Sequence, residues 1–267
     1  MKTITAFVGS ARKRGLTYTA TRQFLDNLQS FGDVQCEIVF LSEYNLGVCH
    51  GCKSCFARGE ECCPLKDDRD VLIEKMTISD GVVLASPVYS FQVSAIMKTF
   101  LDRLGFVFHR PRFHGKSFTS IVVQGIYGGG KVVKYLDFVG GGLGFNVVKG
   151  SCVTALEPMI EKEWRKMDAA LARQSRRFRV QLLKPALPAP SLLQLMAFKM
   201  SCTTVKLMLG DDNRDYTYYR DHGWFESDYY YPTRLNPLKK AAGAGFAWMG
   251  AHIARQREAR PAPRLAK

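Results

Sequence analysis

The stretch TITAFVGSARKRGLT, residues 3–17, decides the fold. Its first six residues are mostly apolar and run into a glycine–serine pair, and a helical pattern of apolar residues begins near Thr17. This order predicts a short strand, a tight loop and the N-terminus of a helix. The residues that follow repeat the same order.

Strands and helices alternate up to residue 155. Beyond the first unit, the pattern predicts strands at residues 36–41, 81–86, 118–125 and 145–155, and helices at 67–76, 91–104 and 131–139. The run GVVLAS at 81–86 is apolar on both faces, as in a buried parallel strand. Alternation of this kind predicts an α/β fold with a doubly wound, five-stranded parallel sheet in the order 2-1-3-4-5.

The C-terminal part of the chain has a different pattern. A long amphipathic helix is expected at residues 157–183, and the proline-rich segment KPALPAPS then breaks it. A Leu- and Met-rich helix is expected at 191–210, followed by an aromatic, turn-rich segment at 215–232. Two roles are open for the aromatic side chains of Trp224 and residues 229–231, namely covering the edge of a ligand site and packing in a core.

These patterns divide the chain into two expected domains. The first, residues 1–183, contains a cysteine-rich loop at 49–63; the second, 184–267, is a helical, aromatic-rich extension with a basic tail. From residue 234 onward the tail holds eight Lys and Arg against one Glu, which is half of the formal charge of +14. We favour a solvated tail over peripheral contact with a membrane, and we expect no nucleic-acid partner.

The N-terminal segment suggests where the protein resides. It has no apolar run long enough for the core of a signal peptide. No stretch of the sequence approaches the roughly eighteen uninterrupted apolar residues of a membrane-spanning helix. We therefore expect a cytoplasmic protein. In a reducing compartment, clustered cysteines bind metal or do redox chemistry more often than they form structural disulfides.

Three loops rich in glycine, proline or hydroxyl groups follow the first, third and fourth expected strands. In the order 2-1-3-4-5 they meet at one edge of the sheet, near the point where the strand order reverses and open parallel sheets bind ligands. In the first loop, a helix start, the Ser10 and Thr17 hydroxyls and the Arg12 guanidinium suit a phosphate monoester. The second, SPVYS at 86–90, suits a flat ring lying against the main chain, and the glycines of QGIYGGG at 124–130 let backbone approach a ligand closely.

With these loops, roughly residues 1–155 resemble the NADPH-dependent FMN reductase family of the flavodoxin-like fold. The segments GSARKRGLT, SPVYSFQVSAIMKTFLDRL and FHGKSFTSIVVQGIYGGG carry the resemblance. It implies that the FMN phosphate is held by Ser10, Arg12 and Thr17. It also implies that the isoalloxazine lies between two groups of residues, which are Pro87, Val88, Tyr89 and Ser90 on one side and Gln124, Gly125 and Gly128 on the other.

The loop CHGCKSCFARGEECCP, residues 49–64, holds five of the eight cysteines. The spacing alone fits an iron–sulfur cluster, a zinc site or a redox disulfide. The loop also resembles the cysteine motif of the iron-sulfur flavoproteins, and the residues PLKDD continue that resemblance in a register that favours Cys63 over Cys62 as fourth ligand. The resemblance thus implies a [4Fe-4S] cluster held by Cys49, Cys52, Cys55 and Cys63, with a zinc or metal-free loop and a redox disulfide as alternatives.

The resemblance implies an FMN-dependent NAD(P)H oxidoreductase that passes electrons to an unidentified acceptor. Because flavin chemistry belongs to the cofactor, no catalytic side chain is expected. The alternatives are a non-enzymatic flavin or iron–sulfur electron carrier and a redox-responsive interaction module without a cluster. Flavodoxin-like reductases commonly dimerise, so we expect a homo-oligomer.

Overall fold

The computed structural model describes residues 1–184 and 187–258, and the chain divides into two compact units. The sheet unit comprises Met1–Gly51 and Leu65–Ala186, and the helical unit comprises Cys52–Pro64 and Leu187–Lys267. Most of the cysteine loop therefore groups with the C-terminal helices. The last nine residues of the basic tail, 259–267, lie outside the described residues.

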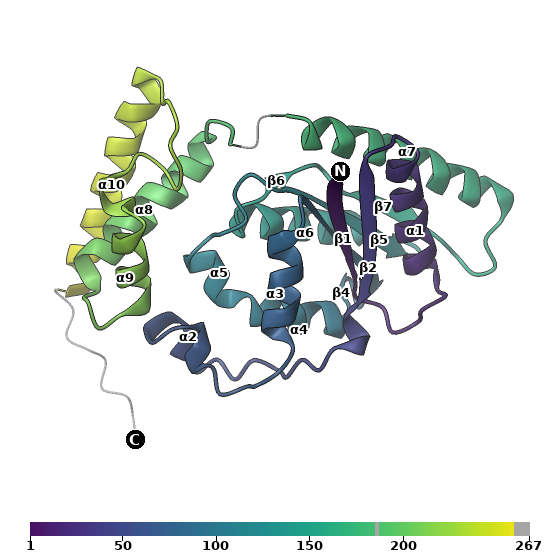
Figure 1. The fold of residues 1–267 in the computed structure, drawn as a ribbon, viewed down its shortest axis with the longest axis horizontal. Helices are drawn as coiled ribbons and strands as arrows, with labels where there is room; N and C mark the ends of the chain where they lie inside the picture. The colour runs from purple at the N-terminus through teal and green to yellow at the C-terminus, as the bar shows by residue number, and fades with distance from the viewer. Residues whose placement is uncertain (185–186, 259–267) are drawn as a thin grey trace. The chain divides into compact units, whose positions relative to one another are not determined.

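A parallel β-sheet forms the centre of the sheet unit (Figure 1). Its strands run in the order β2-β1-β3-β5-β6, and β7 continues the position of β6 because it also pairs with β5. The parallel strands are β1 (Lys2–Val8), β2 (Val34–Phe40), β3 (Gly81–Tyr89), β5 (Ser117–Gln124), β6 (Asn146–Val147) and β7 (Ser151–Thr154). Counted by position, this is the predicted order 2-1-3-4-5, which is confirmed.

The fifth position differs from prediction because it is two short strands rather than one. Along β5 the pairing advances four residues, from Ser117 to Ile121, while the partner chain advances five, from Asn146 to Ser151. The extra residue falls at the corner that contains Gly150 and interrupts the ladder, as a β-bulge does. A Cβ at Gly150 would lie 2.0 Å from Ser120 Oγ, so this close approach requires glycine.

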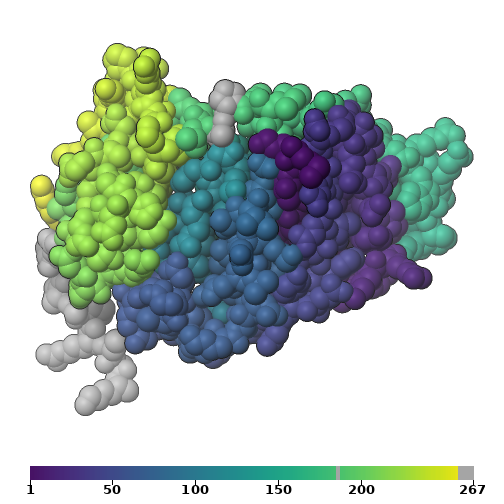
Figure 2. Space-filling model, in the orientation of Figure 1, coloured from purple at the N-terminus to yellow at the C-terminus, as the bar shows by residue number. Residues whose placement is uncertain are grey.

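Helices cover both faces of the sheet (Figure 1). One face is covered by α1 (Leu16–Gln29) and α7 (Glu161–Leu182). These helices direct apolar side chains at helical spacing into one core with the strands, among them Phe24, Leu28, Met167, Leu171 and Phe178. The other face is covered by α3 (Arg69–Ile78), α4 (Ala95–Arg103), α5 (Gly105–His109) and α6 (Gly129–Gly142). Figure 2 shows α3, in blue, as part of the outer surface of this unit.

Two helices of the sheet unit, α4 and α7, begin four residues later than predicted. After β3, positive φ angles at Ser90 and Phe91 turn the chain into the two-residue β4 (Gln92–Val93), which pairs back antiparallel onto β3. The helix α4 therefore begins at Ala95, and the Ser94 hydroxyl accepts the N–H of Met97 as its cap. The helix α7 begins at Glu161 instead of residue 157, so residues 157–160 belong to the segment between β7 and α7.

The helical unit has a core of its own. Its elements are α2 (Ser54–Ala57), η2 (Glu60–Cys62), α8 (Leu192–Met208), α9 (Arg214–Asp221), η3 (Trp224–Glu226) and α10 (Pro237–Glu258); η1 (Leu41–Glu43) belongs to the sheet unit. Trp224 and Tyr229 are 4% and 5% exposed in this core, and the indole N–H donates to the carbonyl of Tyr230 at 3.1 Å. Core packing is therefore the role of these two aromatic residues. Among the described helices, none is both long enough and apolar enough to span a membrane.

Candidate functional site

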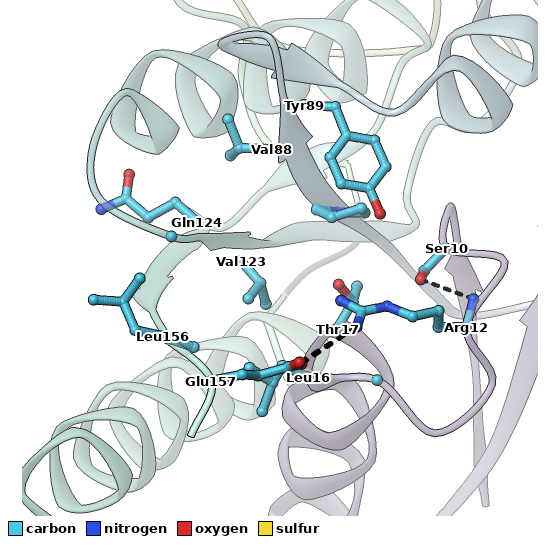
Figure 3. Close-up of a pocket in the computed structure, with 14 residues that line it drawn as sticks. Ser10, Arg12, Leu16, Thr17, Val88, Tyr89, Val123, Gln124, Leu156 and Glu157 are labelled. Atoms are coloured by element: carbon cyan, nitrogen blue, oxygen red, sulfur yellow. Dashed lines mark hydrogen bonds and ion pairs between the residues drawn. The ribbon is translucent and has the colours of Figure 1, made fainter. Parts of the chain in front are cut away.

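A cavity of about 260 Å³ lies at the carboxyl ends of four parallel strands of the sheet unit (Figure 3). Its walls come from the loops after β1, β5 and β7 and from the last residues of β3 and β5. Eight of the ten residues predicted to bind FMN line it, namely Ser10, Arg12, Thr17, Pro87, Val88, Tyr89, Gln124 and Gly125. The other two, Ser90 and Gly128, are not part of the lining. The structure therefore brings the three predicted loops together at one site.

The N-terminus of α1 forms one corner of the cavity. Its N-cap is Gly15, which has no side chain to cap the helix, so the first N–H groups have no acceptor within the helix. The Ser10 and Thr17 side chains beside them are buried, at 4% exposure each, and Ser10 Oγ accepts the N–H of Arg12 at 3.2 Å. Open N–H groups, the positive end of a helix dipole and two hydroxyls make this corner suited to an anion.

Arg12 and Glu157 meet across this corner. Arg12 Nη1 lies 3.4 Å from Glu157 Oε2, and Figure 3 shows the two side chains reaching toward each other from different loops. Both side chains are more than half exposed, at 65% and 54%. The guanidinium that would bind a phosphate is thus paired with a carboxylate that would repel one.

The opposite part of the cavity is formed by the C-terminal ends of β3 and β5. Residues 87–89 at the end of β3 form one wall, and the Tyr89 ring, half exposed, points toward the first loop (Figure 3). The Gln124 side chain is held on the other side, because its amide donates to Thr154 Oγ1 at 2.8 Å and accepts the N–H of Gly129 at 2.7 Å. These bonds fix the backbone at residues 124–125, where it can lie against a planar ring.

Ser90 and Gly128 serve the turns beside the cavity. Ser90 has a positive φ in the turn before β4, and Gly128 has a φ of +95° immediately before α6. A Cβ at Gly128 would also lie 2.9 Å from the Phe91 ring. Both residues therefore shape the loops whose neighbours line the cavity.

Six lining residues were absent from the sequence prediction: Gly15, Leu16, Val123, Ala155, Leu156 and Glu157. The last three follow β7 directly, at the same edge as the other loops. The rule that parallel sheets bind ligands at the carboxyl ends of their strands would have found them. The sequence pattern instead assigned Glu157 to the helix expected at 157–183, so the loop after the last strand was not considered.

The five cysteines of the loop at 49–63 differ in their exposure to solvent. Cys49, Cys52 and Cys62 are exposed, Cys55 is half-buried and Cys63 is buried. Hydrogen bonds from the Ser54 hydroxyl and N–H lower the pKa of the Cys52 thiol. Within residues 1–184 and 187–258, no three His, Cys, Asp or Glu side chains lie close enough together to hold a metal ion. The thiols suit an iron–sulfur cluster chemically, but the structure does not gather three of them around one point.

Two aspartates that follow this loop clamp its base. Asp67 accepts the N–H of Gly47 at 2.9 Å and a hydrogen bond from Arg103 Nη2 at 2.8 Å, and Asp68 accepts the N–H of Asn45 at 2.7 Å. The side chains of Asp67 and Arg103 are only 5% and 3% exposed. Burial opposes the ionised form of Asp67, but hydrogen bonds from Arg103 and two backbone N–H groups outweigh it and lower the pKa of this carboxyl.

Comparison with known proteins identifies the family of the chain. The family model of NADPH-dependent FMN reductases matches residues 2–157, more than half of the chain. The chain therefore belongs to the NADPH-dependent FMN reductase family, and with it to the oxidoreductases.

Two relatives are named iron-sulfur flavoproteins. One, from Archaeoglobus fulgidus, is 38% identical over 153 residues, which cover 54% of this chain and 68% of the relative. The other, from Methanocaldococcus jannaschii, is 38% identical over 95 residues, or 36% of this chain, and the match spans about half of that relative's length, 48%.

Solved structures with low sequence identity share the fold. The azoreductase from Bacillus anthracis str. Sterne has a TM-score of 0.51 at 14% identity, covering 66% of this chain and 98% of its own. RosB, solved with bound 8-demethyl-8-formylriboflavin-5'-phosphate, has a TM-score of 0.53 at 13% identity and covers 89% of this chain and 92% of its own. At these identities the likeness establishes the flavodoxin-like architecture alone.

Proposed function

We propose that this chain is an FMN-dependent NAD(P)H oxidoreductase that passes electrons to a second acceptor. One observation carries the proposal: a single cavity combines the α1 N-terminus and its hydroxyl side chains with a wall made by residues 87–89 of β3. FMN has a phosphate, which suits the helix N-terminus, and a planar ring, which suits the wall. Membership of the NADPH-dependent FMN reductase family supports the assignment.

The residues of the cavity divide the work of binding. Ser10, Thr17, Arg12 and the first N–H groups of α1 would hold the phosphate. The wall at 87–89 and the backbone at 124–125, fixed through Gln124, would hold the ring and keep water from its faces. Bound FMN supplies the chemistry, which is acceptance of hydride and release of electrons singly or in pairs. No side chain is required to move a proton.

We propose in addition that Cys49, Cys52, Cys55 and Cys63 hold a [4Fe-4S] cluster. Their spacing, the names of the relatives and the lowered pKa of Cys52 support this, because metals bind the thiolate form. Since no three metal-binding side chains are gathered in the described structure, the loop would have to reorganise when the cluster is inserted. A homo-oligomer and a cytoplasmic location remain predictions.

The test is anaerobic purification followed by quantification of flavin, iron and sulfide and by steady-state oxidation of NADH and of NADPH. We expect one FMN per chain, turnover above that of free FMN, and about four irons per chain. Flavin without turnover would identify an electron carrier instead of an enzyme. Flavin without iron would remove the cluster and leave the reductase, and failure to bind FMN would overturn the proposal.

A further inference from the structure

The cavity proposed to bind FMN is called the flavin cavity from here on. A second cavity, of about 560 Å³, lies in the sheet unit away from it. Four of its seven lining residues are cationic, namely Lys149, Arg173, Arg176 and Arg177. The remaining three are Gly150, Ser151 and Ala170, so no carboxylate lines it. Within the described part of the chain, none of the four cations forms an ion pair with a carboxylate. A hollow lined by four positive charges and by no carboxylate attracts anions.

The two cavities lie at opposite ends of β7. Ser151, at the start of β7, lines the basic cavity, and Ala155, immediately after its end, lines the flavin cavity. Four extended residues span about 13 Å. The cavities share no lining residue, so an anion in the basic cavity would occupy a site separate from the proposed FMN phosphate site.

The helix α7 forms one wall of this cavity, and Gln174 fixes its position. Its side chain is fully buried, and its amide donates to Thr119 Oγ1 and to the carbonyl of Ser120, both at 2.8 Å. Residue 174 faces the sheet, and the arginines at 173, 176 and 177 around it on the helix are exposed. The three guanidiniums are thus presented by a helix whose rotation is set by buried hydrogen bonds.

The corner between β6 and β7 is fixed as well. The N–H of Gly150 donates to Asp137 Oδ2 at 3.1 Å, and the Ser120 hydroxyl donates to Asp137 Oδ1 at 2.9 Å. Arg177 Nη2 donates to the carbonyl of Lys149 at 3.4 Å and so connects α7 to this corner. The carboxylate of Asp137 accepts these hydrogen bonds and lies outside the cavity lining, although it also interacts electrostatically with Lys149 and Arg177.

We propose that the basic cavity binds a small polyphosphate anion, such as pyrophosphate or the diphosphate group of a nucleotide. Guanidinium groups match phosphate oxygens in pairs, and four positive charges correspond to the charge of two phosphate groups better than to that of one. The volume falls within the range of about 300–1,000 Å³ that is usual for small-molecule sites. A hollow bounded by two fixed elements favours a compact anion over a flat acidic surface.

The experiment is a calorimetric titration of the full chain with pyrophosphate at physiological ionic strength. The test variant is Arg173→Gln with Arg176→Gln. Its matched control is Arg165→Gln with Lys166→Gln, which removes the same charge from exposed positions of the same helix outside the cavity. The variant Arg12→Gln reports on any binding of pyrophosphate in the flavin cavity.

We expect one pyrophosphate per chain, an affinity at least about tenfold weaker in the test variant, and a change of less than about twofold in the control and in Arg12→Gln. The absence of binding to the unaltered chain at millimolar pyrophosphate would overturn the proposal. Equal weakening in the control would show an effect of net charge alone, and loss in Arg12→Gln would place the anion in the flavin cavity; each of these results also overturns it. Circular dichroism of all variants checks that they are folded.

Discussion

The pairing of Arg12 with Glu157 bears directly on phosphate affinity. The guanidinium is the one cationic side chain among the described lining residues of the flavin cavity, and Glu157 is the one carboxylate. Both side chains are well exposed, so their mutual attraction is screened by water and is worth at most about 1 kcal/mol. A phosphate held at the α1 N-terminus would therefore replace Glu157 as the partner of Arg12 with little loss.

We predict opposite effects from changing these two residues. Arg12→Gln removes a charge-assisted bond to phosphate and should weaken FMN binding by about 10- to 100-fold, since hydrogen bonds to charged groups are worth about 1.5–3 kcal/mol. Glu157→Gln removes the competing carboxylate and should strengthen binding by about two- to fivefold. Quenching of flavin fluorescence measures both.

The control for this pair is Lys13→Gln. Lys13 belongs to the same loop but pairs with Glu43 and does not line the cavity. The affinity of the Lys13→Gln variant for FMN should stay within about twofold of that of the unaltered chain. If Lys13→Gln weakened FMN binding as much as Arg12→Gln, the loss would reflect general charge and not a contact with the phosphate.

The adjacent cysteines 62 and 63 offer a second test with a built-in control. Cys63 is buried, whereas Cys62 is exposed and its Sγ lies 3.8 Å from the carbonyl of Arg58 in the preceding turn. We predict that Cys63→Ser lowers iron and sulfide content severely after anaerobic purification, while Cys62→Ser retains both. The reverse result would identify Cys62 as the fourth ligand. Unchanged iron content in both variants would show that neither Cys62 nor Cys63 is required as a ligand.

At the scale of elements, the base of the cysteine loop depends on Asp67. The buried bond to Arg103 on α4 and the bond to Gly47 join the two ends of the loop to the sheet unit. Asp67→Asn removes the charge from a buried, charge-assisted contact with Arg103, so it should lower the free energy of unfolding by about 1.5–3 kcal/mol. Asp102→Asn, which breaks a surface pair on the same helix, should cost less than about 0.5 kcal/mol. Urea denaturation measures both.

The same carboxyl should give the fold a pH dependence. The pKa of Asp67 is lower in the folded chain than its ordinary value in an unfolded one. Its contribution to stability is therefore fully present above the ordinary pKa and is lost as the pH falls through the lower, folded value. The urea midpoint of the original chain should decline over this acidic range more steeply than that of Asp67→Asn, and parallel curves would contradict this.

The sequence predicted the elements of the sheet unit better than their ends. Alternating apolar runs are a strong signal, and the strand order follows from them. The sequence prediction puts Phe91 in a helix, because the residue types of Ser90 and Phe91 do not indicate two positive φ angles followed by the short strand β4. Glu157 was placed in a helix because its neighbours suit one, although it lies in the cavity beside Arg12. Both errors come from tertiary contacts that override local preference.

At the scale of the whole molecule, the chain consists of two units with separate cores. All fourteen lining residues of the flavin cavity belong to the sheet unit. A ligand stabilises what it binds, so FMN should stabilise the sheet unit and leave the helical unit unchanged if the two unfold separately. At a free FMN concentration of 100 times the Kd, the gain is about 2.7 kcal/mol, or a rise in Tm of about 5–10 °C.

The three tryptophans allow the units to be followed individually. Trp164 lies in the sheet unit, whereas Trp224 and Trp248 lie in the helical unit. In a Trp164→Phe variant the tryptophan emission would report the helical unit alone, and far-ultraviolet circular dichroism would report the whole chain. We predict that FMN raises the Tm of the main dichroism transition and leaves that of the tryptophan transition within about 1 °C. A tryptophan transition that rises by the same amount would show that the two units unfold as one, because only energetic coupling can carry the stabilisation from the flavin cavity into the core around Trp224.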